Sequence, residues 1–112
     1  MPAAPTTEPS TLLPHPAVDE LVLTEVLAAL ADPIRLEMVT GLHESGVERT
    51  CSSFALPIAK STASHHWKTL REAGVVYARE EGTKKYHGLR TADLEARFPG
   101  LLESVVRGSG SD

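Results

Sequence analysis

The sequence predicts one mainly α-helical domain that carries a small β-hairpin. Three observations lead to this fold class. Apolar residues recur every three or four positions over most of the chain, a glycine-containing link joins two strand-like runs near residue 82, and more helical pattern follows that hairpin. The 112 residues suit one domain, and a hydrophobic content of 41% is enough for one core. The expected order is four helices, two strands, and one or two closing helices.

The two ends of the chain are expected to lie outside the folded domain. Five of the first 16 residues are prolines, which lack a backbone donor and resist regular pairing, so residues 1–16 are predicted to form a disordered arm. The sequence Gly-Ser-Gly-Ser-Asp at residues 108–112 predicts a flexible tail. Residues 17–107 remain as the folded domain.

Apolar stripes and one capping motif predict the first helices. The stripe of the first helix runs from Asp19 onward, and Asp32-Pro33 ends that helix and begins a second one, because Asp is a good N-cap and Pro fits the first helical turn. The second helix carries apolar residues from Ile34 to Leu42. A short third helix is expected at about residues 51–56.

A fourth helix and a hairpin follow. The helix is expected to be capped by Ser61 or a neighbour and to run to Ala73, with Gly74 as its stop and Trp67 in its buried stripe. Two strands, at residues 75–79 and 84–89, are joined by Glu80-Glu81-Gly82-Thr83. Thr91 is expected to cap a short helix, and Pro99 is expected to start the last one. A helix followed by a basic two-stranded hairpin is the layout of a winged helix.

Basic residues concentrate where the fourth helix and the hairpin are predicted. The chain as a whole carries a net charge of −4, yet residues 60–90 hold seven basic and three acidic residues. Because local potential matters more than total charge, a basic face on an acidic body predicts a nucleic-acid footprint. The alternative is a protein-interaction winged helix, without sequence-specific DNA binding, whose basic face meets an acidic partner.

Two stretches resemble the ArsR/SmtB family of winged helix-turn-helix transcriptional regulators. They are LADPIRL at residues 30–36, similar to the start of the family's second helix, and KSTASHHWKTLREAGVV at residues 60–76, similar to its recognition helix and exit. The likeness spans roughly residues 18–106. It implies a homodimeric repressor of a roughly palindromic operator. In that family the first and last helices form the dimer, the fourth helix enters the major groove, and the wing lies along the DNA backbone.

The residues predicted to contact double-stranded DNA lie on the fourth helix and on the hairpin. Hydroxyl, imidazole and amine groups at a helix N-terminus can reach base edges, and hairpin cations suit phosphates. His66 is equally well interpreted as a packed helix histidine. Lys84 and Lys85 are adjacent on a strand and face opposite ways, so only one of them is expected to face phosphate. The predicted set is Lys60, Ser61, Thr62, Ser64, His65, His66, Lys68, Arg79, Lys84 and Lys85.

The first and last helices carry more apolar surface than a small domain can hide. Leu23 and Leu27 lie off the main stripe of the first helix, and the last helix carries Leu101, Leu102 and Val105 on just over two turns. These five residues are predicted to form a two-fold dimer interface.

The inducing signal is left open by the sequence. Metal-sensing relatives carry a Cys-x-Cys pair on the third helix, whereas this chain has Thr50-Cys51-Ser52-Ser53, and its last helix holds Glu103 but no histidine. Cys51 is therefore expected to be a small buried residue, and no cofactor is expected to be required. An unusual nickel or zinc site, a redox event at Cys51, and an effector protein remain as alternatives. The scattered candidates for metal ligands are His15, Asp19, Glu20, His43 and His87.

Other classes of protein are not favoured. There is no nucleophile–base pair, phosphate loop or pair of carboxylates at telling spacing, so an enzyme is not expected. No apolar run approaches the ~20 residues that span a bilayer, and the start of the chain has no basic stretch followed by an apolar one. With a single cysteine, this predicts a cytoplasmic protein.

Overall fold

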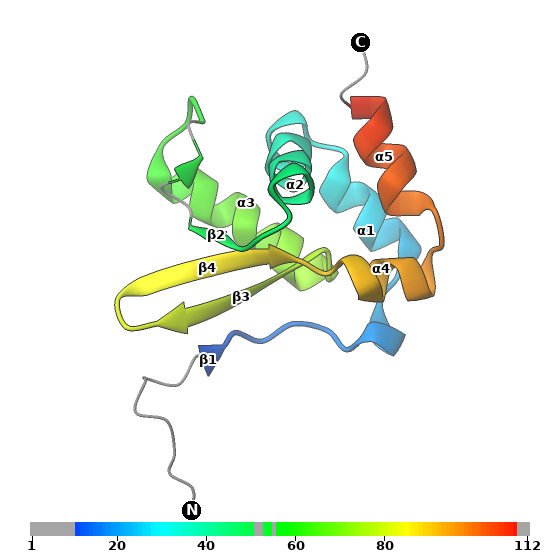
Figure 1. The fold of residues 1–112 in the computed structure, drawn as a ribbon, viewed down its shortest axis with the longest axis horizontal. Coiled ribbons are helices and arrows are strands. Elements are labelled where there is room, and N and C mark those ends of the chain that lie inside the picture. The colour runs from blue at the N-terminus through cyan, green and yellow to red at the C-terminus, as the bar shows by residue number, and fades with distance from the viewer. Residues whose placement is uncertain (1–10, 51–52, 55, 110–112) are drawn as a thin grey trace, which may run out of the picture.

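A computed structural model of the chain describes residues 11–50, 53–54 and 56–109. It is mostly helical, with a small antiparallel hairpin, as expected (Figure 1). The expected third helix includes Cys51, Ser52 and Ala55, which lie outside the described residues. The elements are β1 (Thr11–Leu12), a 3-10 helix η1 (Val18–Glu20), α1 (Leu23–Leu30), α2 (Pro33–Ser45), β2 (Arg49–Thr50), α3 (Lys60–Ala73), β3 (Val76–Glu81), β4 (Lys84–Leu89), α4 (Thr91–Arg97) and α5 (Leu101–Ser109).

The first two helices begin where local chemistry sets their N-termini. Helix α2 starts as predicted, because the Asp32 carboxylate accepts hydrogen bonds from the backbone N–H groups of Ile34 (2.8 Å) and Arg35 (3.1 Å), with Pro33 at the first helical position. Helix α1 starts later than the expected Asp19. Residues 18–20 form a 3-10 turn instead, closed by the Glu20 carboxylate, which accepts from Ala17 N at 2.8 Å.

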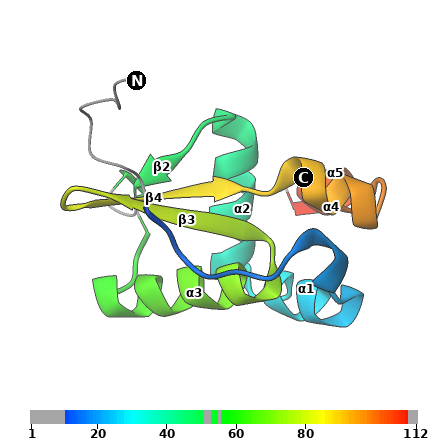
Figure 2. The same ribbon diagram turned by 90° about the horizontal axis from the view of Figure 1, so that it is seen from below.

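The hairpin β3–β4 leaves the helical body as a long ribbon, and α3 lies alongside it with its N-terminal end toward the hairpin tip (Figures 1 and 2). Gly74, in the left-handed conformation at φ 90°, ends α3 as predicted. The hairpin loop is shorter than the predicted four residues, because Glu81 and Lys84 still pair across the strands. Only Gly82 (φ 62°) and Thr83 turn the chain, which suits the glycine at the first loop position.

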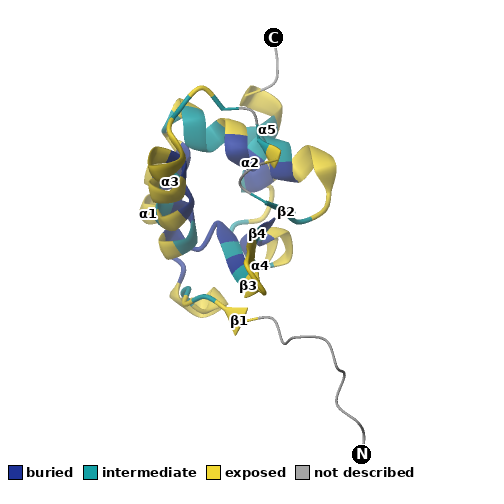
Figure 3. Ribbon diagram, turned by 90° about the vertical axis from the view of Figure 1, so that its left-hand side faces the viewer, coloured by how far each residue is buried: buried dark blue, intermediate teal, exposed yellow. Residues whose placement is uncertain are grey.

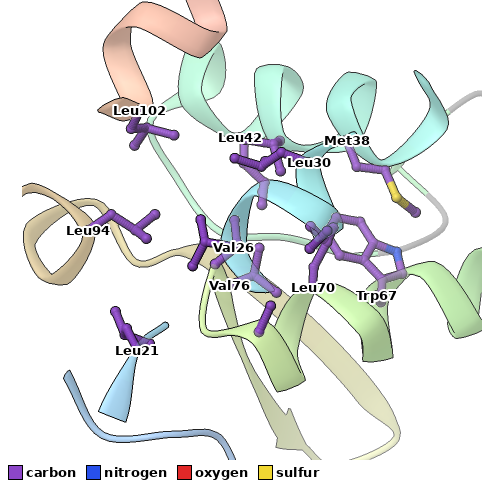
Figure 4. Close-up of a cluster of buried hydrophobic side chains, with 14 of the residues drawn as sticks. Leu21, Val26, Leu30, Met38, Leu42, Trp67, Leu70, Val76, Leu94 and Leu102 are labelled. Atoms are coloured by element: carbon purple, nitrogen blue, oxygen red, sulfur yellow. The ribbon is translucent and has the colours of Figure 1, made fainter. Parts of the chain in front are cut away.

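One hydrophobic core joins the helices to the base of the hairpin (Figure 4). Trp67 and Leu70 of α3 pack into it with Met38 of α2 and Val76 of β3, and all four side chains are at most 3% exposed. Leu102 of α5 also belongs to this core and is only 5% exposed. Its place differs from the prediction, because α5 folds back onto α2 and α4 and buries Leu102 within the protomer. Leu102 is therefore not available to a second chain.

The N-terminal segment departs from the predicted arm over residues 11–16. Strand β1 pairs with β3, with Thr11 opposite Glu80, so the sheet has the order β1-β3-β4-β2. Arginine side chains then bind carbonyl oxygens of the proline-rich stretch: Arg71 Nε donates to Pro14 O at 3.0 Å, and an Arg90 guanidinium N–H donates to Pro16 O at 2.7 Å. Proline lacks the N–H donor but keeps the carbonyl acceptor, and these contacts use the acceptor.

At the other end, α5 runs through Gly108 to Ser109, two residues into the expected tail. The Ser109 hydroxyl donates to Val106 O at 2.9 Å and lies 3.0 Å from the Thr40 hydroxyl of α2. These bonds explain why the helix continues. The remainder of the predicted arm and tail, residues 1–10 and 110–112, lies outside the described residues.

Candidate nucleic-acid interface

Helix α3 presents one exposed face on the side away from the core (Figure 3). An α-helix turns about 100° per residue, so the buried positions Ala63, Trp67 and Leu70 define the inner side. The opposite side carries predicted DNA-contact residues that are all exposed: Ser61, Thr62, His65 and Lys68. Lys68 makes a loose ion pair, 3.9 Å, with Glu72 one turn later.

The N-terminus of α3 differs in detail from the prediction. The helix begins at Lys60, two residues earlier than a Ser61 cap requires, and its N-cap is Ala59, which has no side-chain acceptor. The first-turn N–H groups therefore have no side-chain cap, and they carry the positive end of the helix dipole. This arrangement favours anions near Lys60 and Ser61.

His66 is held against α2 rather than directed outward. Its Nδ1 lies 3.0 Å from a guanidinium nitrogen of Arg35, whose Nε donates to Ala29 O at 2.7 Å. Because a guanidinium can only donate, Nδ1 accepts and the proton lies on Nε2. The half-buried ring favours the packed interpretation of His66 over base contact.

A groove of about 370 Å³ separates α3 from the hairpin. One stripe of α3, at helical spacing, lines one wall, and residues of β2, the hairpin loop and β4 line the other. Lys84 is exposed, and Lys85 lies 3.9 Å from the Glu80 carboxylate. The lining contains four cations and no carboxylate. One of these cations, Arg71, was not among the residues that the sequence predicted to contact DNA. The lining residues are Thr50, Lys60, Ser64, Trp67, Arg71, Thr83, Lys84, Lys85 and His87.

His87 connects the hairpin to α3. Its imidazole stacks on the Trp67 indole with the ring centroids 4.1 Å apart and 7° between the planes, and it is only 3% exposed. This differs from the surface position expected of scattered histidines. Burial lowers the pKa of His87 to about 4, with the positive charges of Lys85 and Arg71 acting in the same direction. The ring is therefore neutral at pH 7.

Arg79 is engaged by acidic residues of its own chain. Its guanidinium forms a salt bridge with Glu48 at 2.7 Å and a second with Glu81, and it lies over the Tyr86 ring, 4.5 Å from the centroid. The Tyr77 hydroxyl also donates to Glu48, at 2.6 Å. The predicted phosphate contact by Arg79 is thus not favoured, because these carboxylates already occupy its donors.

The contacts within this cluster shift the pKa values of Glu48 and Tyr77. The hydrogen bonds from Arg79 hold the pKa of Glu48 below its usual value. Burial, together with the hydrogen bond to Glu48, raises the pKa of Tyr77 to about 12. The hydrogen bonds and salt bridge to Glu48 join β3 to the segment before β2.

Candidate metal ligands are not brought together in the part of the chain that the structure describes, where no group of three or more His, Cys, Asp or Glu side chains could hold an ion. His87 is buried against Trp67, and Cys51 lies outside the described residues. In the same part of the chain, no helix has the length and apolar character needed to cross a membrane.

Comparisons with known proteins agree with this geometry. A family model described as a helix-turn-helix domain matches residues 30–76, which contain α2, β2 and α3. The chain is 37% identical over 89 residues to the uncharacterized HTH-type transcriptional regulator YceK of Bacillus subtilis, covering 78% of this chain and 89% of that protein. It is 38% identical over 64 residues to the uncharacterized HTH-type transcriptional regulator MJ1325 of Methanocaldococcus jannaschii, covering 56% of this chain and 72% of that protein. The chain therefore belongs to the HTH-type transcriptional regulators.

Proposed function

We propose that the protein is a sequence-specific repressor of the ArsR/SmtB type, which acts as a homodimer on a palindromic operator. The observation that carries this proposal is the exposed outer face of α3, which lies next to a cationic groove and a basic hairpin. In winged helix-turn-helix proteins a helix in this position enters the major groove. The resemblance of residues 30–36 and 60–76 to the family supports the narrower assignment.

Base reading is assigned to the outer face of α3. His65 lies on the side opposite Trp67, and Ser61 and Lys68 are its neighbours on that face. Their imidazole, hydroxyl and ammonium groups can bond the acceptors and donors that base pairs present in the major groove. His66 is not assigned to base contacts, because Arg35 binds its ring.

Phosphate binding is assigned to the cations beside that face. Lys60 at the start of α3 and Lys84 at the hairpin tip lie on opposite walls of one groove, and neither forms an ion pair with another described residue. Uncapped N–H groups at the helix start add a second set of donors. Such contacts fix the register of the protein on the duplex and are not specific for sequence.

Dimerisation is assigned to α1 and α5. The side chains of Val22, Leu23 and Leu27 are 45%, 43% and 41% exposed, and they stand together at and after the start of α1. Leu101 and Val105 of α5 are half-buried. A second copy would cover this surface with the same residues and place two α3 helices toward successive major grooves.

Selection from a random duplex library with the purified full-length chain tests the proposal. We expect enrichment of a motif with two-fold symmetry, and the selection repeated with nickel or zinc ions shows whether either acts as an effector. Equal recovery of all duplexes would contradict sequence-specific binding and favour the protein-interaction alternative.

A further inference from the structure

The groove between α3 and the hairpin has features that contact with DNA does not require. Trp67 and His87 line it, and each is only 3% exposed. Trp67 Nε1 and His87 Nδ1 are both buried, with no hydrogen-bond partner among the described residues. Most buried polar atoms in folded proteins have a partner, so it is unusual that two side chains lining one groove each keep a ring nitrogen without one.

The charges around the groove select the sign of that ligand. Lys60, Arg71, Lys84 and Lys85 line it, and none of the nine lining residues is acidic. Burial is the main cause of the lowered pKa of His87, and the positive charges of Lys85 and Arg71 act in the same direction. The positive charges of these side chains stabilise a negative charge placed in the groove.

The size and lining of the groove limit the ligand further. A volume of about 370 Å³ is at the lower end of sites that hold small organic molecules. Trp67 and His87, whose rings stack on each other, contribute the small exposed part of their side chains to the lining, and Ser64 and Thr83 add hydroxyl groups to it. Aromatic ligands pack favourably against aromatic side chains in offset or edge-to-face arrangements.

We propose that this groove binds a small aromatic carboxylate, whose carboxylate pairs with Lys60 and Lys84 and whose ring packs against Trp67 and His87. The site does not depend on the function proposed above. Its regulatory consequence does rest on that function: the ligand occupies two lysines assigned to phosphate, so it weakens DNA binding.

Trp67 is the single tryptophan of the chain, so its fluorescence reports on the groove directly. Benzoate titrated into the full-length protein should change this fluorescence and saturate. Two matched compounds separate the parts of the site: benzamide has a similar shape without the charge, and cyclohexanecarboxylate has the charge without the aromatic ring. Each should bind about tenfold more weakly than benzoate.

Charge variants complete the test. Lys60→Met and Lys84→Met remove one ammonium each from exposed side chains and should each raise the Kd of benzoate severalfold. Arg107→Met removes one positive charge from the exposed face of α5 and should leave the Kd unchanged. A fluorescence change that does not saturate, equal binding of benzamide, or lysine variants that bind like the wild type would each overturn the site.

An experiment with DNA separates the ligand site from its proposed effect on DNA binding. Benzoate should weaken the binding of the wild-type protein to a duplex selected from the library, and Lys84→Met should blunt this effect. Because the fluorescence titration contains no DNA, saturable benzoate binding upholds the site even if the chain binds no duplex. Inorganic phosphate that competes as well as benzoate would overturn the aromatic part of the assignment.

Discussion

The imidazole of His87 lies face to face with the indole of Trp67, 4.1 Å between centroids, and this stack joins strand β4 to helix α3. The two residues come from the hairpin and from the helix that we assign to base reading. Their contact therefore sets where the hairpin lies relative to that helix. The stack also buries a titratable side chain, because His87 is only 3% exposed.

The stack should make the stability of the fold depend on pH. The pKa of His87 is about 4 in the folded chain, against 6.5 for an ordinary histidine. Between these values the unfolded chain binds more protons, so the free energy of unfolding falls as the pH is lowered. From pH 7.5 to pH 5 we expect a loss of about 2 kcal/mol from this group. Urea unfolding at the two pH values measures it.

The variant His87→Phe is the control, since phenylalanine keeps a ring against Trp67 and does not titrate. It should lose most of the pH dependence. The pKa of His15 is also lowered, mainly by burial, and accounts for a remaining slope of the same sign. The same pH dependence in both proteins would show that His87 is not the responsible group.

The hairpin lysines should act on every duplex alike. Changing Lys84 and Lys85 to Ala together should weaken binding to selected and random duplexes equally. It should also reduce the slope of log K against log salt concentration by up to about one for each phosphate that the variant no longer binds. Lys84 should account for more of the effect, because Lys85 lies near Glu80. A loss confined to the selected duplex, with an unchanged salt slope, would count against this role.

The cluster around Glu48 should affect stability and leave DNA binding alone. Tyr77→Phe removes the hydroxyl that donates to Glu48 and should lower the free energy of unfolding by about 1 kcal/mol. Arg79→Ala should also destabilise the fold, while the salt slope of DNA binding stays as in the wild type. Thermal unfolding and a salt titration on the same samples decide this. A reduced salt slope in Arg79→Ala would restore Arg79 to the phosphate contacts.

The dimer assignment rests on residues that are exposed in one protomer. Leu23→Glu combined with Leu27→Glu should give a folded monomer, because both side chains are more than 40% exposed. Light scattering and circular dichroism report mass and fold. Leu102→Asp should instead unfold the chain, at a cost of about 3–5 kcal/mol, because it buries a charge in the core of the protomer. A wild-type protein that is monomeric at micromolar concentration would refute the assignment.

Local rules predicted the elements that depend on neighbouring residues. Asp32 caps α2, Gly74 ends α3 and Gly82 turns the hairpin, and each of these features is set within a few positions of the chain. The buried stripe of α3 follows from helical periodicity alone, as Trp67 shows. The same periodicity places Arg71 on one face of α3 with Lys60. The position of Arg71 beside the groove could therefore have been predicted from the sequence.

Contacts between distant parts of the chain could not be predicted in this way. Glu48 and Arg79 are 31 positions apart, and no local pattern indicates that a carboxylate neutralises that hairpin cation. Leu102 illustrates a related limit. An apolar helix face shows that something covers it, but it does not show whether the cover is the same chain or a second copy.

The most direct test of the account is the contribution of His65 to the preference for a selected duplex over a scrambled one. Affinities of wild type and His65→Ala for both duplexes, measured at one fixed salt concentration, give this ratio. His43→Ala removes another exposed histidine, from α2, and serves as the control. We predict that His65→Ala lowers affinity for the selected duplex by about 1–3 kcal/mol, keeps its affinity for the scrambled one, and folds normally. An unchanged ratio in folded His65→Ala would contradict base reading by this face of α3.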